Sequence, residues 1–186
     1  MKKPNKTTTQ AIDELEAGQG EHFEITEDLF GDLLEEIPLK TVIFDMDGTL
    51  ADCEHRRHFV RGEKKNFDAF YAAMGEDGRN EVVCELAAMY AGHNDYFVVI
   101  CTGRPEKYRA ITEQWLLDNE IEYHHLYMRP DDRLYDKDSD VKRDMLKQIK
   151  IDSWTDPILA VDDRDQVVKM WREEGLDCLQ VAEGNF

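Results

Sequence analysis

Short apolar runs alternate with longer amphipathic segments from residue 39 onward. The runs are four to six residues long and rich in Val, Ile, Phe and Tyr, which is typical of strands. They predict five strands, at residues 41–44, 96–101, 123–128, 158–161 and 178–181.

The segments between these runs have the periodicity of helices. Apolar residues recur every three or four positions, and the last segment stops at Gly175, a common residue just beyond a helix end. The predicted helices are 81–90, 107–119, 141–149 and 166–174. Strict alternation of strand and helix predicts an α/β fold, with a parallel sheet covered by helices on both faces.

Two stretches do not follow this alternation. Residues 1–38 are acidic with sparse apolar positions, and we expect a partly mobile N-terminal extension that could include a short amphipathic helix at 27–37. Residues 52–80 follow the first strand and are basic and aromatic in the middle. We interpret them as a small, mostly helical cap insertion that could overhang a site within a single domain at 39–186.

Composition narrows the function classes. The net charge of −18 argues against broad attraction to a phosphate backbone, although it suits a group of carboxylates around a divalent cation. The apolar runs are too short to span a bilayer, and no apolar segment follows the N-terminal lysines. The four cysteines lack a CxxC spacing, so we expect reduced thiols in a cytoplasmic protein rather than disulfides or zinc.

Chemically active residues follow several of the predicted strands. Because the carboxyl ends of parallel strands meet at one edge of a sheet, these residues are expected to converge there. The first strand leads into Asp45-Met46-Asp47-Gly48-Thr49, the second into Thr102-Gly103-Arg104, and the fourth into Asp162-Asp163, with Lys142 near the start of a helix.

These residue types suggest phosphoryl transfer. Asp45 can attack phosphorus, and Asp47 can protonate the leaving oxygen and then activate water. Gly48 permits a tight turn whose N–H groups face the phosphate, while Thr102 and Lys142 can hold its oxygens. We expect a Mg²⁺ ion to be held by the acids Asp45, Asp47, Asp162 and Asp163.

Simpler interpretations remain open at each position. The Asp-x-Asp-Gly segment could bind calcium, although it lacks the further ligands of an EF-hand loop. Either Asp162 or Asp163 could cap the following helix while the other reaches the metal. Lys142 could be an ordinary surface lysine, and Thr102 an ordinary turn residue at a strand end.

The segment DMDGTL, a strand ending in Thr102, then Lys142, then the Asp162-Asp163 pair together resemble the haloacid dehalogenase (HAD) superfamily over roughly residues 40–186. The resemblance implies a Rossmann-like HAD fold with Asp45 as nucleophile. Since true dehalogenases lack the second acid, Asp47 implies a phosphatase.

A closer similarity is to the 3′-phosphatase half of bacteriophage polynucleotide kinase. It rests on CTGRPEKYRAITEQWL, DKDSDVKRDML and LAVDDRDQVVKMWREEGLDCLQVAEGNF, while the GxxxxGK[ST] phosphate loop of the kinase half is absent from the sequence. The resemblance implies functional roles for Arg56, Arg104 and Asp138, with Asp138 orienting Lys142 or Arg104. The expected substrate-binding residues are Gly48, Thr49, Arg56, Gly103, Arg104 and Asp138.

We therefore expect Mg²⁺-dependent hydrolysis of a phosphate monoester through an aspartyl-phosphate, on the 3′ end of DNA or RNA. The alternatives are a nucleotidase acting on free nucleoside monophosphates, a phosphatase of a sugar or other metabolite, and a non-enzymatic phospho-receiver or binding module. The expected partner is a phosphorylated nucleic-acid end or nucleotide, with no membrane and no protein partner evident.

Overall fold

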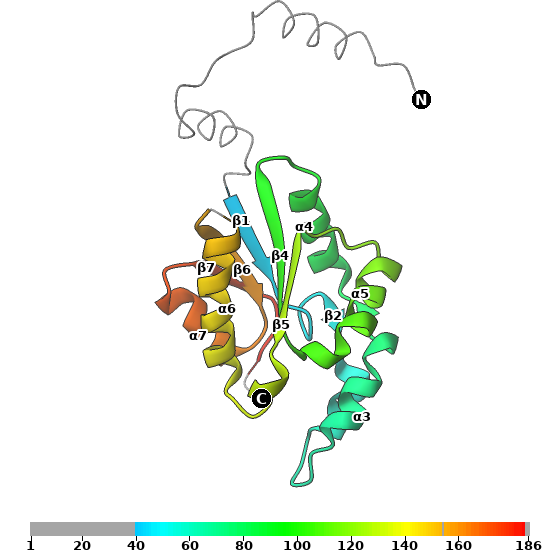
Figure 1. The fold of residues 1–186 in the computed structure, drawn as a ribbon. Helices are drawn as coiled ribbons and strands as arrows, with labels where there is room; N and C mark the ends of the chain where they lie inside the picture. The colour runs from blue at the N-terminus through cyan, green and yellow to red at the C-terminus, as the bar shows by residue number, and fades with distance from the viewer. Residues whose placement is uncertain (1–39, 154, 185–186) are drawn as a thin grey trace, which may run out of the picture. The chain divides into compact units, whose positions relative to one another are not determined.

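The computed structural model describes residues 40–153 and 155–184, so the expected extension at 1–38 lies outside the described residues. A five-stranded sheet forms the centre of the described domain, in the order β5-β4-β1-β6-β7 (Figure 1). All four strand pairings are parallel, which confirms the predicted sheet. The strands are β1 (Lys40–Phe44), β4 (Tyr96–Pro105), β5 (His125–Arg129), β6 (Pro157–Asp162) and β7 (Asp177–Gln180).

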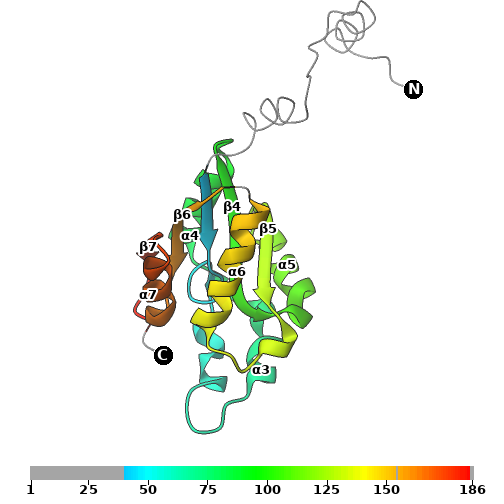
Figure 2. The same ribbon diagram turned by 60° about the vertical axis from the view of Figure 1, so that its left-hand side comes forward.

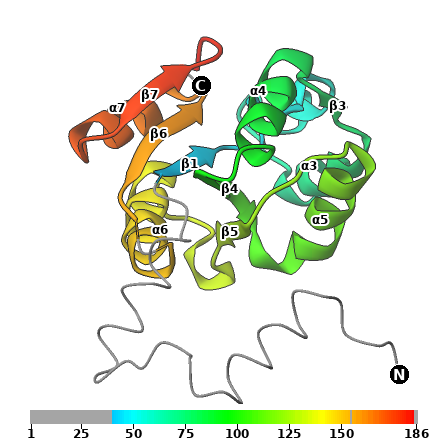
Figure 3. The same cartoon turned by 90° about the horizontal axis from the view of Figure 1, so that it is seen from above.

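Helices cover both faces of the sheet. Along β1, Val42 and Phe44 contribute to one buried cluster and Ile43 to the other, because successive side chains of a strand point to opposite faces. Helices α4 (Glu81–Ala91) and α5 (Arg109–Asp118) lie on one side. Helices α6 (Asp138–Asp152) and α7 (Asp165–Glu173) lie on the other, as Figure 3 shows from above.

The predicted insertion lies between β1 and α4. It contains 3-10 turns at Glu54–Phe59 and Met74–Glu76 and the short helix α3 (Phe67–Ala72). Its two ends form an antiparallel ribbon of β2 (Ala51–Asp52) and β3 (Gly78–Arg79), which the helical expectation did not include. Figures 1 and 2 show α3 beyond the carboxyl ends of the sheet strands, where a cap would overhang a site.

Most element boundaries differ from prediction by one or two residues. Helix α6 begins at Asp138 rather than at residue 141, because acidic residues in a first helical turn are favoured by the helix dipole. Helix α7 ends before Gly175, whose φ of +87° explains the glycine. All four cysteines are buried and unpaired. Among residues 40–153 and 155–184, we find no helix long and apolar enough to cross a membrane.

Candidate active site

The loop after β1 places two acids at the carboxyl edge of the sheet. The Asp45 amide donates to the carbonyl of Val161 in β6 at 3.0 Å, which fixes the start of the loop. Gly48 then turns the chain at a φ of +89°. A Cβ atom at Gly48 would lie 2.1 Å from Asp163 Oδ2, so both the backbone conformation and the close approach of Asp163 require glycine there.

Three buried carboxylates from two strands meet beside this loop. Asp45, Asp162 and Asp163 each offer an oxygen within 4.8 Å of the others, the type of cluster that could hold a metal ion. Lys142 reaches them from α6, and its Nζ donates to Asp45 Oδ1 at 2.7 Å and to Asp162 Oδ2 at 2.8 Å. The side chain of Lys142 is 1% exposed, so it is not an ordinary surface lysine.

Electrostatics in this cluster reflect burial and crowding. Burial raises the pKa of Asp45 well above its usual range, and the charges of Asp162 and Asp163 add to the rise against the lowering effect of Lys142. Burial and Asp162 likewise raise the pKa of Asp163 to about 6. For Lys142, burial would lower the pKa, but Asp162 and Asp45 outweigh it and hold the ammonium charged. The three carboxylates concentrate negative charge in one place, and a bound cation would offset that charge.

Hydrogen bonding distinguishes the two acids after β6. Both oxygens of Asp162 already have partners, because it accepts from Lys142, from the Trp171 indole at 3.2 Å and from the Arg164 amide at 3.1 Å. Asp163 Oδ1 is buried with no hydrogen-bond partner, an expensive state for a carboxylate oxygen. Neither side chain caps α7. Its unpaired oxygen makes Asp163 the more available metal ligand of the two, and all-oxygen donors suit a hard cation such as Mg²⁺.

Two arginines and two acids form a buried network beside the cluster. Arg56 binds Asp77 through Nε and Nη2, both at 2.6 Å, and its Nη2 also donates to Asp47 Oδ1 at 2.6 Å. Arg104 donates from Nε to Asp47 Oδ1 and from Nη2 to Asp77 Oδ2, each at 2.8 Å. Both arginines are 0% exposed, and Arg104 Nη1 has no partner. The two negative charges balance the two guanidinium charges.

This network accounts for the position of Asp47. Its carboxylate faces Arg56 and Arg104 and is not part of the acidic trio, although the sequence suggested it as a metal ligand. Burial would raise the pKa of Asp47, but Arg104 and Arg56 outweigh burial and lower it. The Asp47 side chain therefore lies on the loop that also carries Asp45, where it could exchange a proton with a leaving oxygen. The two arginines favour its ionised form.

The other expected residues lie around the same edge. The Thr102 hydroxyl accepts from the Arg104 amide at 3.2 Å, which leaves its own proton to be donated. Thr49 Oγ1 is buried without a partner. Asp138 contacts Arg129 at 2.7 Å and Arg164 at 3.3 Å, rather than Lys142 or Arg104 as expected.

Gly103 lies against that aspartate, since a Cβ there would approach Asp138 Oδ1 to 2.6 Å. Asp138 therefore supports the turn after Thr102 from behind.

Sequence reasoning missed two contacts of this site. Asp77 lies at the end of the insertion and accepts from both site arginines, yet in the sequence it is one acid within an acidic stretch. Arg57 donates to Asp163 Oδ2 at 3.3 Å, and its neighbour Arg56 drew attention only through a family resemblance. No local signal distinguishes either residue, because both roles depend on how the insertion folds against the carboxyl edge of the sheet.

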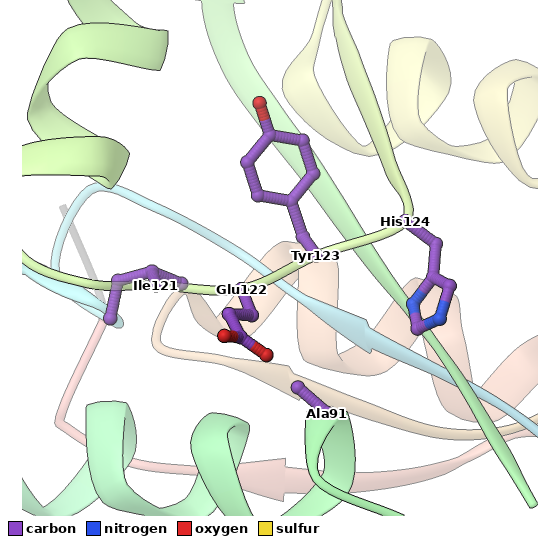
Figure 4. A pocket seen from close by; sticks show the side chains of 5 residues that line it. All are labelled: Ala91, Ile121, Glu122, Tyr123 and His124. Carbon is purple, nitrogen blue, oxygen red and sulfur yellow. The ribbon is translucent and has the colours of Figure 1, made fainter. Parts of the chain in front are cut away.

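A separate surface pocket lies elsewhere in the domain. It is lined by Ala91, where α4 ends, and by the segment Ile121, Glu122, Tyr123 and His124 that leads into β5 (Figure 4). Because α4 ends and β5 begins at the amino edge of the sheet, the pocket is remote from the carboxylates. It has a single acid in its lining, unlike the carboxyl edge.

The fold and site together define a class. An all-parallel sheet with Asp45 and Asp47 after the central strand, and with Lys142 and paired acids beside them, is the arrangement of a HAD-type phosphatase. A solved structure of the same fold is a haloacid dehalogenase-like hydrolase from Streptococcus pneumoniae, at 14% identity and a TM-score of 0.55, covering 77% of this chain and 84% of that one.

Closer relatives narrow the class to one family. Residues 39–186 match the family model described as the polynucleotide kinase PNKP phosphatase domain. Two structures of a Pnkp1/Rnl/Hen1 complex, one described as an RNA repair complex, contain chains 34% and 31% identical to this one, with TM-scores of 0.64 and 0.62.

These matches cover 82% and 80% of this chain and 48% and 44% of those chains, so this chain spans about half the length of either. The chain belongs to the PNKP phosphatase-domain family of HAD phosphomonoesterases.

Proposed function

We propose that the protein is a Mg²⁺-dependent polynucleotide 3′-phosphatase that acts through a phospho-Asp45 intermediate. The single observation that carries the proposal is the buried Asp45, paired with Lys142 beside an Asp163 oxygen that has no partner. Family membership, and the description of one related structure as an RNA repair complex, support a nucleic-acid substrate.

The acidic trio is proposed to hold the cation, mainly through Asp45 and Asp163. When bound, Mg²⁺ would offset the charge of the phosphate dianion and polarise its oxygens. Lys142, already bonded to the nucleophile, orients the Asp45 carboxylate and favours its ionised form against the opposing effect of burial. The unpaired donors of Thr49 and Arg104 Nη1 are available to phosphate oxygens.

The chemistry has two displacements. An oxygen of Asp45 attacks phosphorus, the bond from phosphorus to the 3′ oxygen breaks, and the leaving oxygen takes a proton from Asp47. Asp47 then accepts a proton from water as that water attacks phosphorus, and the bond to Asp45 breaks to release inorganic phosphate. The second step restores both carboxylates to their starting states.

Asp47 must be protonated for the first displacement, yet the arginines lower its pKa. A phosphate dianion that drew Arg104 and Arg56 toward itself would weaken their hold on Asp47. The pKa of Asp47 would then rise when substrate is bound, which couples substrate binding to readiness of the acid.

The test is phosphate release from a 3′-phosphorylated oligonucleotide, its 5′-phosphorylated twin and a 3′-mononucleotide, in DNA and RNA form. Each is measured with Mg²⁺ and with chelator, and Asp45→Asn serves as the blank. Mg²⁺-dependent release from the 3′-phosphorylated oligonucleotide is expected. Release from the mononucleotide alone would instead identify a nucleotidase, and release from none would refute a nucleic-acid substrate.

A further inference from the structure

A row of aromatic rings lies directly against the arginine network. The guanidinium carbon of Arg56 lies 4.1 Å from the centroid of the Phe70 ring on α3. Phe70 meets Tyr71 edge-on at a centroid distance of 5.3 Å. Since Arg56 also bonds Asp47, the rings are continuous with the catalytic edge.

The row extends outward from Tyr71. On one side Tyr71 stacks with Phe67 at 6.4 Å and an interplanar angle of 25°, and on the other it meets Tyr108 at 5.2 Å and 32°. Tyr108 comes from the segment after β4, three residues past Pro105, so two separate elements build the row. Phe67 at the outer end is 49% exposed, which leaves part of a flat apolar surface open to solvent.

Tyr71 is close enough to the site to be affected by its charges. Burial and then the negative charge of Asp47 raise the pKa of Tyr71 to about 12. Tyr71 therefore remains a neutral hydroxyl at the working pH, between the acid that protonates the leaving group and the exposed Phe67.

Positive charge accompanies the rings in a strongly acidic chain. Lys107 Nζ lies 4.9 Å from the Tyr108 ring centroid. Between His55 and Phe67 the sequence has one acid, Glu63, and five basic residues, Arg56, Arg57, Arg61, Lys64 and Lys65. Flat rings flanked by cations suit a nucleic-acid strand, because bases stack on aromatic faces while cations attract the backbone phosphates.

We infer that Phe67, Tyr71 and Tyr108 form a stacking subsite for the unpaired base next to the scissile 3′-phosphate, with Lys107 near the adjoining backbone. This inference rests on the proposed function and adds its substrate class, an unpaired polynucleotide end. A sugar phosphate has no base to place there, and a fully paired terminal base is already stacked within its own duplex.

The test compares Phe67→Ala with Met89→Ala, a matched loss of an exposed apolar side chain on α4. Steady-state kinetics are measured on a single-stranded 3′-phosphorylated oligonucleotide and on the same strand ending in a tetrahydrofuran abasic residue. We expect Phe67→Ala to lower kcat/KM on the first by about tenfold, through KM, with little change on the second. Met89→Ala should leave both unchanged.

A binding measurement isolates stacking from catalysis. A strand whose terminal base is 2-aminopurine is titrated with Asp45→Asn protein, and the fluorescence should be quenched with the Phe67 ring present and much less with Phe67→Ala. Equal effects of Phe67→Ala on the intact and abasic strands, or unchanged quenching, would overturn the stacking subsite. Failure of wild-type protein to hydrolyse either strand would overturn the proposed function and this inference with it.

Discussion

Asp77→Asn tests whether the buried arginine network depends on one acid. Asp77 accepts four contacts: two from Arg56, one from Arg104 and one from His55 at 2.9 Å. The amide keeps the shape of the carboxylate but removes its charge, and it turns an NH₂ group toward guanidinium donors. Two buried arginines would then share Asp47 as their remaining carboxylate.

The expected cost follows from burial. Removing one partner of a buried ion pair costs about 3–5 kcal/mol, and retention of one accepting oxygen places Asp77→Asn near the lower end, about 3 kcal/mol. For a chain of this size, that corresponds to a fall in Tm of about 6–12 °C. Activity should fall as well, because Arg56 and Arg104 would lose the support that aims them at Asp47.

The assay is urea unfolding with thermal scans, beside kcat/KM measurements. Asp95→Asn is the control, because Asp95 is an acid with a 61% exposed side chain that contacts His93 at 3.7 Å. That variant should stay within about 0.5 kcal/mol of wild type. If Asp77→Asn were also within that margin, the network would not have the energetic role assigned to it.

Three further predictions follow from the site. Lys142→Met should lower kcat by about a hundredfold or more in phosphate-release assays, and a near-normal kcat would contradict its role. Gly48→Ala should abolish Mg²⁺-dependent activity through collision with Asp163, whereas Gly62→Ala, at a φ of +98° with nothing within 4 Å, shares the backbone strain but should retain activity. Burial raises the pKa values of Asp45 and Asp163, the latter to about 6, so Mg²⁺ must displace protons from these carboxyl groups when it binds. The increase in Tm that Mg²⁺ produces should therefore grow as the pH rises through about 6. An increase in Tm that does not depend on pH would exclude these two residues as ligands.

Much of the fold follows from the sequence because its local and global signals agree. Apolar runs of strand length alternate with amphipathic segments, and the parallel sheet is the structure that buries both faces of such strands. The β2–β3 ribbon was not predicted, because each of its strands has two residues and so carries no periodicity. The start of α6 was placed late, since its first turn is polar.

The candidate site, like the fold, was predictable from the sequence only in part. The proximity of Asp45, Asp162 and Lys142 could be predicted from the sequence, because strand ends and helix starts converge at one edge of the sheet. The contact of Arg56 with Asp47 and the role of Asp77 could not, because both depend on side chains from an insertion with no regular pattern. Convergence at strand ends is therefore predictable, and the cap contacts are not.

The most direct test of the central claim uses Asp47→Asn and p-nitrophenyl phosphate, whose leaving group needs no protonation. Without the base that activates water, the phosphoenzyme should accumulate, giving a burst of about one nitrophenol per active site and a phosphorylated peptide that contains Asp45. The burst and the peptide should require Mg²⁺ and disappear when Asp45→Asn is added to the same protein. A linear time course without phosphorylated peptide, or a burst that persists without Asp45, would contradict covalent catalysis by this residue.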